Sequence, residues 1–202
     1  MWIVKLGGSL GDDPVLLEWL ELLVRLGGGR VAVVCGGARF ADEVRRVQAH
    51  WQFNDLAAHN MAVLAMAQVA YQLHALNPGL RLAASQREIR QVLQKGQTAL
   101  WLPFEMQRDQ PDRMTNWDNT ADSMALELAC GLNAERLVLV KSCLVDHRCS
   151  LGQLGEAGVV DGHFAQLSET AAFPIEILHK HELAQMRALL LGGHRVSGHA
   201  ER

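Results

Sequence analysis

The chain has 202 residues, of which 49% are hydrophobic and 20% are charged, and its formal net charge at pH 7 is −3. This composition is typical of one soluble domain with a sizeable core, and the small negative charge excludes a general electrostatic attraction to nucleic acid or anionic membranes. No apolar stretch approaches the roughly 18 residues of a transmembrane helix, and no leader pattern precedes the first predicted strand, so a cytoplasmic location is expected.

Two strand–glycine–helix units open the chain. The apolar run Trp2–Leu6 ends at Gly7-Gly8, which predicts a buried strand and a tight turn, and apolar residues at helical spacing then predict a helix over Val15–Leu26. The β-branched run Arg30–Cys35 ends at Gly36-Gly37 and repeats the pattern. Two such units within 50 residues favour an α/β fold whose parallel strands are joined by crossover helices.

The same alternation continues along the chain. Residues 53–76 lack proline and glycine and predict a long, largely buried helix, whereas the polar stretch 108–113 predicts a loop. The remaining predicted strands are Leu80–Ala84, Thr98–Leu102, Arg136–Val140 and a final one near His194–Ser197, and the remaining predicted helices are Gln86–Gln94, Asn119–Cys130 and Glu182–Leu191. No linker divides the chain, so a single domain over residues 1–202 is expected.

The two glycine turns are candidate phosphate sites. A strand–glycine–helix junction offers free backbone N–H groups at the positive end of a helix dipole, and glycine lets a ligand approach the backbone closely. Neither turn fits GxxxxGK[ST] or GxGxxG, so a P-loop and a dinucleotide fingerprint are both excluded. From spacing alone, a tight structural turn and a phosphate cradle both remain open.

Two lysines end predicted strands where ligands gather in open α/β sheets. Lys5 lies in the first strand just before the glycines, and Lys141 follows the apolar run 137–140. The alternative for Lys5 is a side chain that extends to solvent from an edge strand. Lys141 could equally be an ordinary surface lysine at a strand end.

Asp122 lies at the start of a predicted helix, where a carboxylate can simply favour the helix dipole. Four further polar residues crowd the same terminus, more than capping requires: Asp118, Asn119, Thr120 and Ser123. This crowding makes Asp122 a candidate functional carboxylate.

Histidine and cysteine do not indicate a metal site. The nine histidines include His179 and His181, and the four cysteines include Cys143 and Cys149, but neither cluster has the paired short spacings of structural zinc. No CxxC occurs, so a disulfide framework is not expected either.

The ordered motifs of the chain resemble those of the amino acid kinase superfamily. The residues that carry this resemblance are Lys5-Leu6-Gly7-Gly8-Ser9, Cys35-Gly36-Gly37, Thr120-Ala121-Asp122-Ser123 and the strand that ends at Lys141. Three further stretches are similar to the small phosphate kinases of methanofuran-type biosynthesis within that superfamily: Gly36 to Asp42, His59 to Met66 and Gly158 to Asp161.

The resemblance implies a three-layer αβα sandwich with a mainly parallel sheet, whose residues 1–115 bind the acceptor and residues 116–202 the nucleotide. It implies an ATP- and Mg²⁺-dependent kinase that converts a small phosphomonoester to its diphosphate, with no metal ligands from the protein. By the same resemblance, Lys5 and Asp122 are catalytic, Asp122 by orienting the lysines. The residues expected on ATP are Lys5, Gly7, Gly8, Ser9 and Lys141, and those expected on the acceptor are Gly36, Gly37 and Arg39.

The resemblance also implies a homo-oligomer, with the long helix of residues 53–76 as a candidate interface. Uridylate or another small molecule as acceptor, and a non-catalytic nucleotide-binding or storage protein, are the alternatives. Two departures from the superfamily concern the turns: many relatives have a Val-Asp-Gly-type turn after the late strand, where this chain has Lys141 to His147, and relatives often have three glycines where this chain has Gly36-Gly37.

Overall fold

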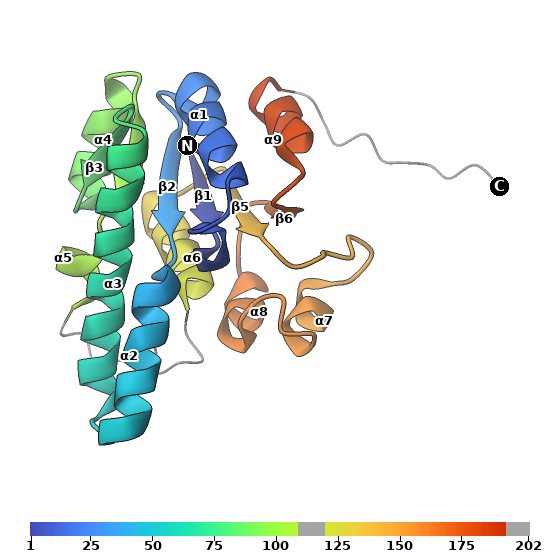
Figure 1. Cartoon of the computed structure of the whole chain (residues 1–202). Coiled ribbons are helices and arrows are strands. Elements are labelled where there is room, and N and C mark those ends of the chain that lie inside the picture. Colours follow the sequence, from blue (N-terminus) through green and yellow to red (C-terminus); the bar gives the residue numbers. More distant parts are fainter. Residues whose placement is uncertain (109–119, 193–202) are drawn as a thin grey trace.

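The computed structural model describes residues 1–108 and 120–192, which form a six-stranded sheet with helices on both faces (Figure 1). The strands are β1 Trp2–Leu6, β2 Val31–Cys35, β3 Leu80–Ala83, β4 Thr98–Trp101, β5 Arg136–Lys141 and β6 Ile175–His179. The helices are the 3₁₀ turn η1 Gly8–Leu10 and α1 Val15–Gly27, α2 Ala38–Trp51, α3 Asp55–Leu76, α4 Gln86–Gln94, α5 Phe104–Gln107, α6 Ala121–Leu132, α7 Leu151–Glu156, α8 Gly162–Ser168 and α9 Leu183–Leu190.

Every strand pair in this sheet is parallel, in the order β3-β4-β2-β1-β5-β6. The central strands are apolar on both faces, as parallel sheets covered by helices require. Side chains of one face, such as Val4 and Leu6, pack with α1 and α9, and those of the other face, such as Ile3 and Leu139, pack with α4, α6 and α8. The predicted α/β fold, a three-layer αβα sandwich with a mainly parallel sheet, is therefore confirmed.

The predicted elements agree well in the first 140 residues. The helix predicted over Gln86–Gln94 is α4, and the long helix predicted over residues 53–76 begins two residues later, at Asp55. Three elements beyond Lys141 were not predicted: α7, α8 and β6. The strand predicted near 194–197 and the loop predicted over 108–113, apart from Arg108, lie outside the described residues.

The prediction that α3 is largely buried is wrong. One side of the helix packs into the core through residues such as Val63 and Leu73, but another side exposes large apolar side chains. Met61, Leu64 and Tyr71 are 37%, 44% and 59% exposed. Figure 1 shows α3 next to α2 at one end of the sheet. The side with Met61, Leu64 and Tyr71 is not covered by any other part of the described chain.

Within the described ranges, no helix has the length and apolar character needed to cross a membrane.

Candidate functional site

Both predicted lysines point to the same side of the sheet. Side chains alternate along a strand, and Ile3 in β1 and Leu139 in β5 face the layer that contains α6. Lys5 and Lys141 each lie two residues further along these strands and therefore face α6 as well. Since β1 and β5 are hydrogen-bonded neighbours, the two ammonium groups come together at the carboxyl edge of the sheet.

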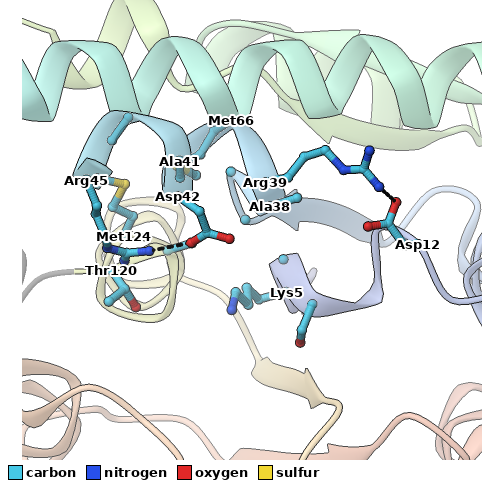
Figure 2. Close-up of a pocket in the computed structure, with 16 residues that line it drawn as sticks. Lys5, Asp12, Ala38, Arg39, Ala41, Asp42, Arg45, Met66, Thr120 and Met124 are labelled. Carbon is cyan, nitrogen blue, oxygen red and sulfur yellow. Dashed lines mark hydrogen bonds and ion pairs between the residues drawn. The ribbon is translucent and has the colours of Figure 1, made fainter. Parts of the chain in front are cut away.

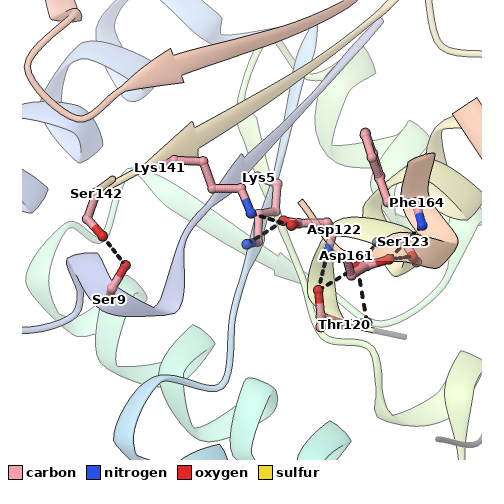
Figure 3. Close-up of polar contacts among 9 residues, drawn as sticks. All are labelled: Lys5, Ser9, Thr120, Asp122, Ser123, Lys141, Ser142, Asp161 and Phe164. Atoms are coloured by element: carbon pink, nitrogen blue, oxygen red, sulfur yellow. Dashed lines mark hydrogen bonds and ion pairs between the residues drawn. The ribbon is translucent and has the colours of Figure 1, made fainter. Parts of the chain in front are cut away.

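The carboxylate of Asp122 lies between these ammonium groups, as Figure 3 shows. Asp122 is in the first turn of α6 and is only 2% exposed. Its Oδ1 lies 2.6 Å from Nζ of Lys5, and its Oδ2 accepts a hydrogen bond from Nζ of Lys141. Two cations thus share one buried anion, and the cluster carries a surplus of positive charge when both lysines are protonated.

Burial and charge act in opposite directions on this cluster. Burial by itself would raise the pKa of Asp122, but the charges and hydrogen bonds of the two lysines outweigh it and hold the pKa below its ordinary value of 3.8. Burial and the neighbouring Lys5 charge lower the pKa of Lys141, and Asp122 offsets only part of this effect. An anion bound beside Lys141 would favour the charged form of this lysine and so raise its pKa again.

The two glycine turns pack directly against each other. A Cβ added to Gly8 would lie 2.9 Å from the backbone N of Ala38, and one added to Gly36 would lie 2.9 Å from the backbone N of Gly8. A Cβ on Gly7 would lie 2.9 Å from the carbonyl oxygen of Val140, which already accepts a hydrogen bond from the Gly7 N–H. Glycine is therefore required at these positions because the two turns pack too closely for a Cβ. The same close packing brings the starts of η1 and α2 side by side.

A pocket of about 350 Å³ opens over these turns (Figure 2). The N-terminus of α2 faces it through Gly37, Ala38 and Arg39, and no side chain caps that terminus. Ala38 follows the two glycines and has φ of +46°, a left-handed conformation that residues with a Cβ rarely adopt. The uncapped helix start, with its positive dipole end, makes this a candidate anion site next to Lys5.

Ion pairs surround this pocket. Arg39 pairs with Asp12, and the hydrogen bond to that carboxylate raises the pKa of Arg39. Arg45 Nη1 lies 3.0 Å from Oδ1 of Asp42, one helical turn earlier on α2. The pocket thus presents guanidinium groups that can bind phosphate and carboxylates that can bind a cationic group.

A contact between hydroxyl groups joins the turns after β1 and β5. The Oγ atoms of Ser9 and Ser142 lie 2.6 Å apart, and Nε2 of His179 lies 3.2 Å from the carbonyl oxygen of Ser142. Ser9 lines the pocket and also contacts Ser142, the residue that follows Lys141, as Figure 3 shows.

The structure brings most of the predicted site residues together. Those that line the pocket are Lys5, Gly8, Ser9, Gly36, Gly37 and Arg39. Asp122 contacts the pocket residue Lys5 and also Lys141. Gly7 packs against Val140 of β5. The roles assigned to these residues stay predictions, as do Asp118 and Asn119, which lie outside the described residues.

Sequence reasoning missed Asp42 and Arg45 in the pocket wall. Asp42 follows Arg39 by three residues, and Arg45 follows Asp42 by three, so each of these side chains is a neighbour of the previous one on α2. This spacing could have indicated both residues. It also missed the part played by Asp161, whose carboxylate accepts hydrogen bonds from Thr120 and Ser123 beside Asp122 (Figure 3). No local pattern indicates that contact.

In residues 1–108 and 120–192, no group of three or more His, Cys, Asp or Glu side chains is arranged to hold a metal ion.

Comparisons with known proteins agree with this geometry. Residues 1–143 match the model of the amino acid kinase family. The [5-(aminomethyl)furan-3-yl]methyl phosphate kinase of Methanocaldococcus jannaschii is 23% identical over 140 residues, which are 69% of this chain and 64% of the relative. The chain thus matches less than two thirds of the length of this curated relative.

Two solved structures share the fold over nearly the whole chain. Uridylate kinase from Archaeoglobus fulgidus has a TM-score of 0.70 and 16% identity, and covers 95% of this chain and 96% of its own. UMP kinase from Bacillus anthracis has a TM-score of 0.70 and 15% identity, and covers 96% of this chain and 92% of its own.

Proposed function

The chain belongs to the amino acid kinase family, and on that premise we propose that it transfers the γ-phosphoryl group of ATP to the phosphate of a small phosphomonoester, giving a diphosphate and ADP. The observation that carries the proposal is the shared contact of Lys5 and Lys141 with Asp122 beside the uncapped start of α2. It supports the proposal because binding two phosphate groups side by side requires positive charge and N–H donors close together, and the lysine pair and the start of α2 supply both.

Phosphoryl transfer needs positioning and neutralisation of charge more than covalent help from the protein. An oxygen of the acceptor phosphate attacks the γ-phosphorus, and the bond from that phosphorus to the ADP oxygen breaks. The attacking group is already an anion, so no general base has to remove a proton. Lys5 contacts the transferring group, Lys141 contacts the phosphates of ATP, and Asp122 holds the two ammonium groups in place.

The residues present fit ATP as the donor. The lysine pair and the uncapped α2 terminus supply cations and N–H donors, which polyphosphate needs. Mg²⁺ bound to the nucleotide would further neutralise charge on the phosphates. We propose that residues 116–202 hold the nucleotide and residues 1–115 the acceptor.

We propose [5-(aminomethyl)furan-3-yl]methyl phosphate as the acceptor, in methanofuran-type one-carbon cofactor biosynthesis. The named curated relative supports this choice. The pocket is small, and it pairs guanidinium groups with carboxylates, namely Arg39 with Asp12 and Arg45 with Asp42. Such a wall suits a compact molecule with a phosphate at one end and an amine at the other.

We also propose that the protein is a homo-oligomer that uses the exposed side of α3. The support is the row of exposed apolar side chains, Met61, Leu64 and Tyr71, on one helix. Light scattering after size-exclusion chromatography tests this: Leu64→Glu should yield a smaller species than the wild type. An unchanged monomer in both proteins would contradict the proposal.

A coupled assay of ADP release tests the activity. The protein is incubated with ATP, Mg²⁺ and, separately, the aminomethylfuran phosphate, UMP and isopentenyl phosphate, with a blank that lacks acceptor. Turnover that depends on the furan phosphate is expected. Turnover on UMP alone would identify uridylate, and not the furan phosphate, as the acceptor. ATP binding without turnover on any acceptor would favour a non-catalytic nucleotide-binding protein.

A further inference from the structure

One carboxylate outside the lysine cluster has an unusual number of partners. Oδ2 of Asp161 accepts hydrogen bonds from the Thr120 hydroxyl at 2.7 Å and from the backbone N–H groups of Thr120 and Ser123 at 3.3 and 3.4 Å. Its Oδ1 accepts from the Ser123 hydroxyl at 2.5 Å and from the Phe164 N–H at 2.6 Å. Asp161 therefore caps α8 and binds the first turn of α6 at the same time (Figure 3).

The residues that Asp161 binds flank Asp122 on both sides. Thr120 is the N-cap of α6, and its Oγ1 also accepts a hydrogen bond from the Asp122 N–H at 3.2 Å. Since Oγ1 donates its one proton to Asp161, its lone pairs remain for that N–H. Ser123 follows Asp122 directly and is fully buried. The position of the Asp122 backbone is thus set from both neighbours by a single distant carboxylate.

We propose that Asp161 is a positioning residue that fixes Asp122 between Lys5 and Lys141 through Thr120 and Ser123. This inference rests on the proposed kinase activity. No contact joins Asp161 to either lysine, so its effect passes through the first turn of α6. Thr120 and Ala121 also line the acceptor pocket, so the same clamp fixes one wall of that pocket.

The physical reason is that the lysine cluster tolerates little displacement. Hydrogen bonds to an ionised carboxylate are about twice as strong as neutral ones, and here several converge on one helix turn. A shift of roughly 1 Å in a group that orients the reacting phosphates can lower a rate by about 10²-fold. The rate of transfer therefore depends on the position of the first turn of α6 as well as on the presence of the Asp122 carboxylate.

The main test is Asp161→Ser, which separates the two jobs of the residue. Serine ranks with aspartate as an N-cap, so α8 keeps its cap, but the shorter side chain cannot bridge to Thr120 and Ser123. We expect kcat to fall by about 10²-fold, with the KM values for ATP and acceptor within about threefold of the wild type. Asp161→Asn, which keeps the length and one acceptor oxygen, should recover part of the rate.

The matched control is Ser85→Ala, which removes the N-cap of α4 on a different helix. It should lower the melting temperature and leave kcat unchanged. Wild-type kcat in Asp161→Ser would overturn the proposal, and so would an equal loss of kcat in Ser85→Ala, because the effect would then follow stability alone.

A second measurement does not depend on kinase activity. The chain has four lysines, Lys5, Lys95, Lys141 and Lys180, so ¹³Cε-lysine labelling gives a readable NMR spectrum. In Asp161→Ser the signals of Lys5 and Lys141 should shift and that of the exposed Lys95 should not. Unchanged Lys5 and Lys141 signals would overturn the positioning role. If instead these signals shift but the wild type transfers no phosphate to any acceptor, the proposed kinase function fails and the positioning role stands.

Discussion

Nζ of Lys5 lies 2.6 Å from Oδ1 of Asp122, and the two side chains are only 6% and 3% exposed. A lysine seldom reaches such burial without a partner. Removing one member of a buried ion pair leaves the other charge uncompensated. Substitution of Lys5 therefore tests activity, and substitution of Asp122 tests stability.

Lys5→Met should lower kcat by about 10²–10³-fold, the usual effect of removing one group that stabilises charge in a transition state. Methionine keeps the length and apolar stem of the side chain but lacks the ammonium group. Lys95→Met, at an exposed position after α4, should leave kcat unchanged. The ADP-release assay measures both, and full activity in Lys5→Met would contradict the role of Lys5.

Asp122→Asn should lower the free energy of unfolding at pH 7 by about 3–5 kcal/mol, because two ammonium groups then lie together without their carboxylate. The folded pKa of Asp122 is below its ordinary value of 3.8. The folded state therefore binds fewer protons than the unfolded state in that range, and the stabilisation is present above pH 4 and lost as pH falls through the folded pKa. Urea unfolding from pH 7 to pH 3 should show the difference between wild type and variant shrinking below pH 4. A difference that stays constant would argue against the ion pairs.

ATP binding should take up protons in alkaline buffers whose pH lies below 10.5, the ordinary pKa of lysine. Burial and the Lys5 charge lower the pKa of Lys141 in the free protein, and a neighbouring phosphate raises it again. Calorimetry in buffers of different ionisation enthalpy measures the uptake. Lys141→Met should abolish it, whereas uptake that persists in this variant must come from another group.

Gly8→Ala should destabilise the protein by about 1–3 kcal/mol, because the new Cβ meets backbone atoms of Ala38, which cannot rotate away. Gly152→Ala in the first turn of α7 is the counterpart: its Cβ meets nothing closer than 3.8 Å, and alanine is a better helix former than glycine by at most about 1 kcal/mol. Chemical denaturation should therefore give shifts of opposite sign. Shifts of the same sign would show that the two turns do not pack as closely as described.

Ala38→Gly should stabilise the protein by about 0.5–1 kcal/mol. The left-handed φ of +46° costs a residue with a Cβ roughly 1–2 kcal/mol, and the greater freedom of glycine in the unfolded chain offsets part of the gain. Ala49→Gly, at an exposed interior position of the same helix, should instead lose about 1 kcal/mol. A loss of stability at both positions would show that Ala38 is not strained.

The central strands could be predicted because they are apolar runs, two of which, β1 and β2, are followed directly by glycine. Lys5 and Lys141 could be placed at the same edge for a related reason, since parallel strands present their carboxyl ends together. Strand β6 escaped prediction because its five residues include the charged Glu176, follow Pro174 and lead into a polar run. Helices α7 and α8 are too short, at six and seven residues, to show a helical period.

The clamp by Asp161 was beyond sequence reasoning for a different reason. Its hydrogen bonds to Thr120 and Ser123 span 41 and 38 residues, and such contacts leave no periodic trace. The expectation that α3 is largely buried was wrong because an all-round apolar helix predicts burial in a monomer and contact with another chain equally well, and the second of these was also expected for residues 53–76.

The order of strands in the sheet also bears on how the chain is made. Strand β1 pairs with β2 on one side and with β5, which begins only at Arg136, on the other. During synthesis, an apolar edge of β1 therefore stays unpaired until β5 has emerged from the ribosome. Lys141 is the last residue of β5, so it joins Lys5 only when that edge closes. Closure of the sheet at β5 and assembly of the Lys5, Asp122 and Lys141 cluster are therefore one and the same folding step.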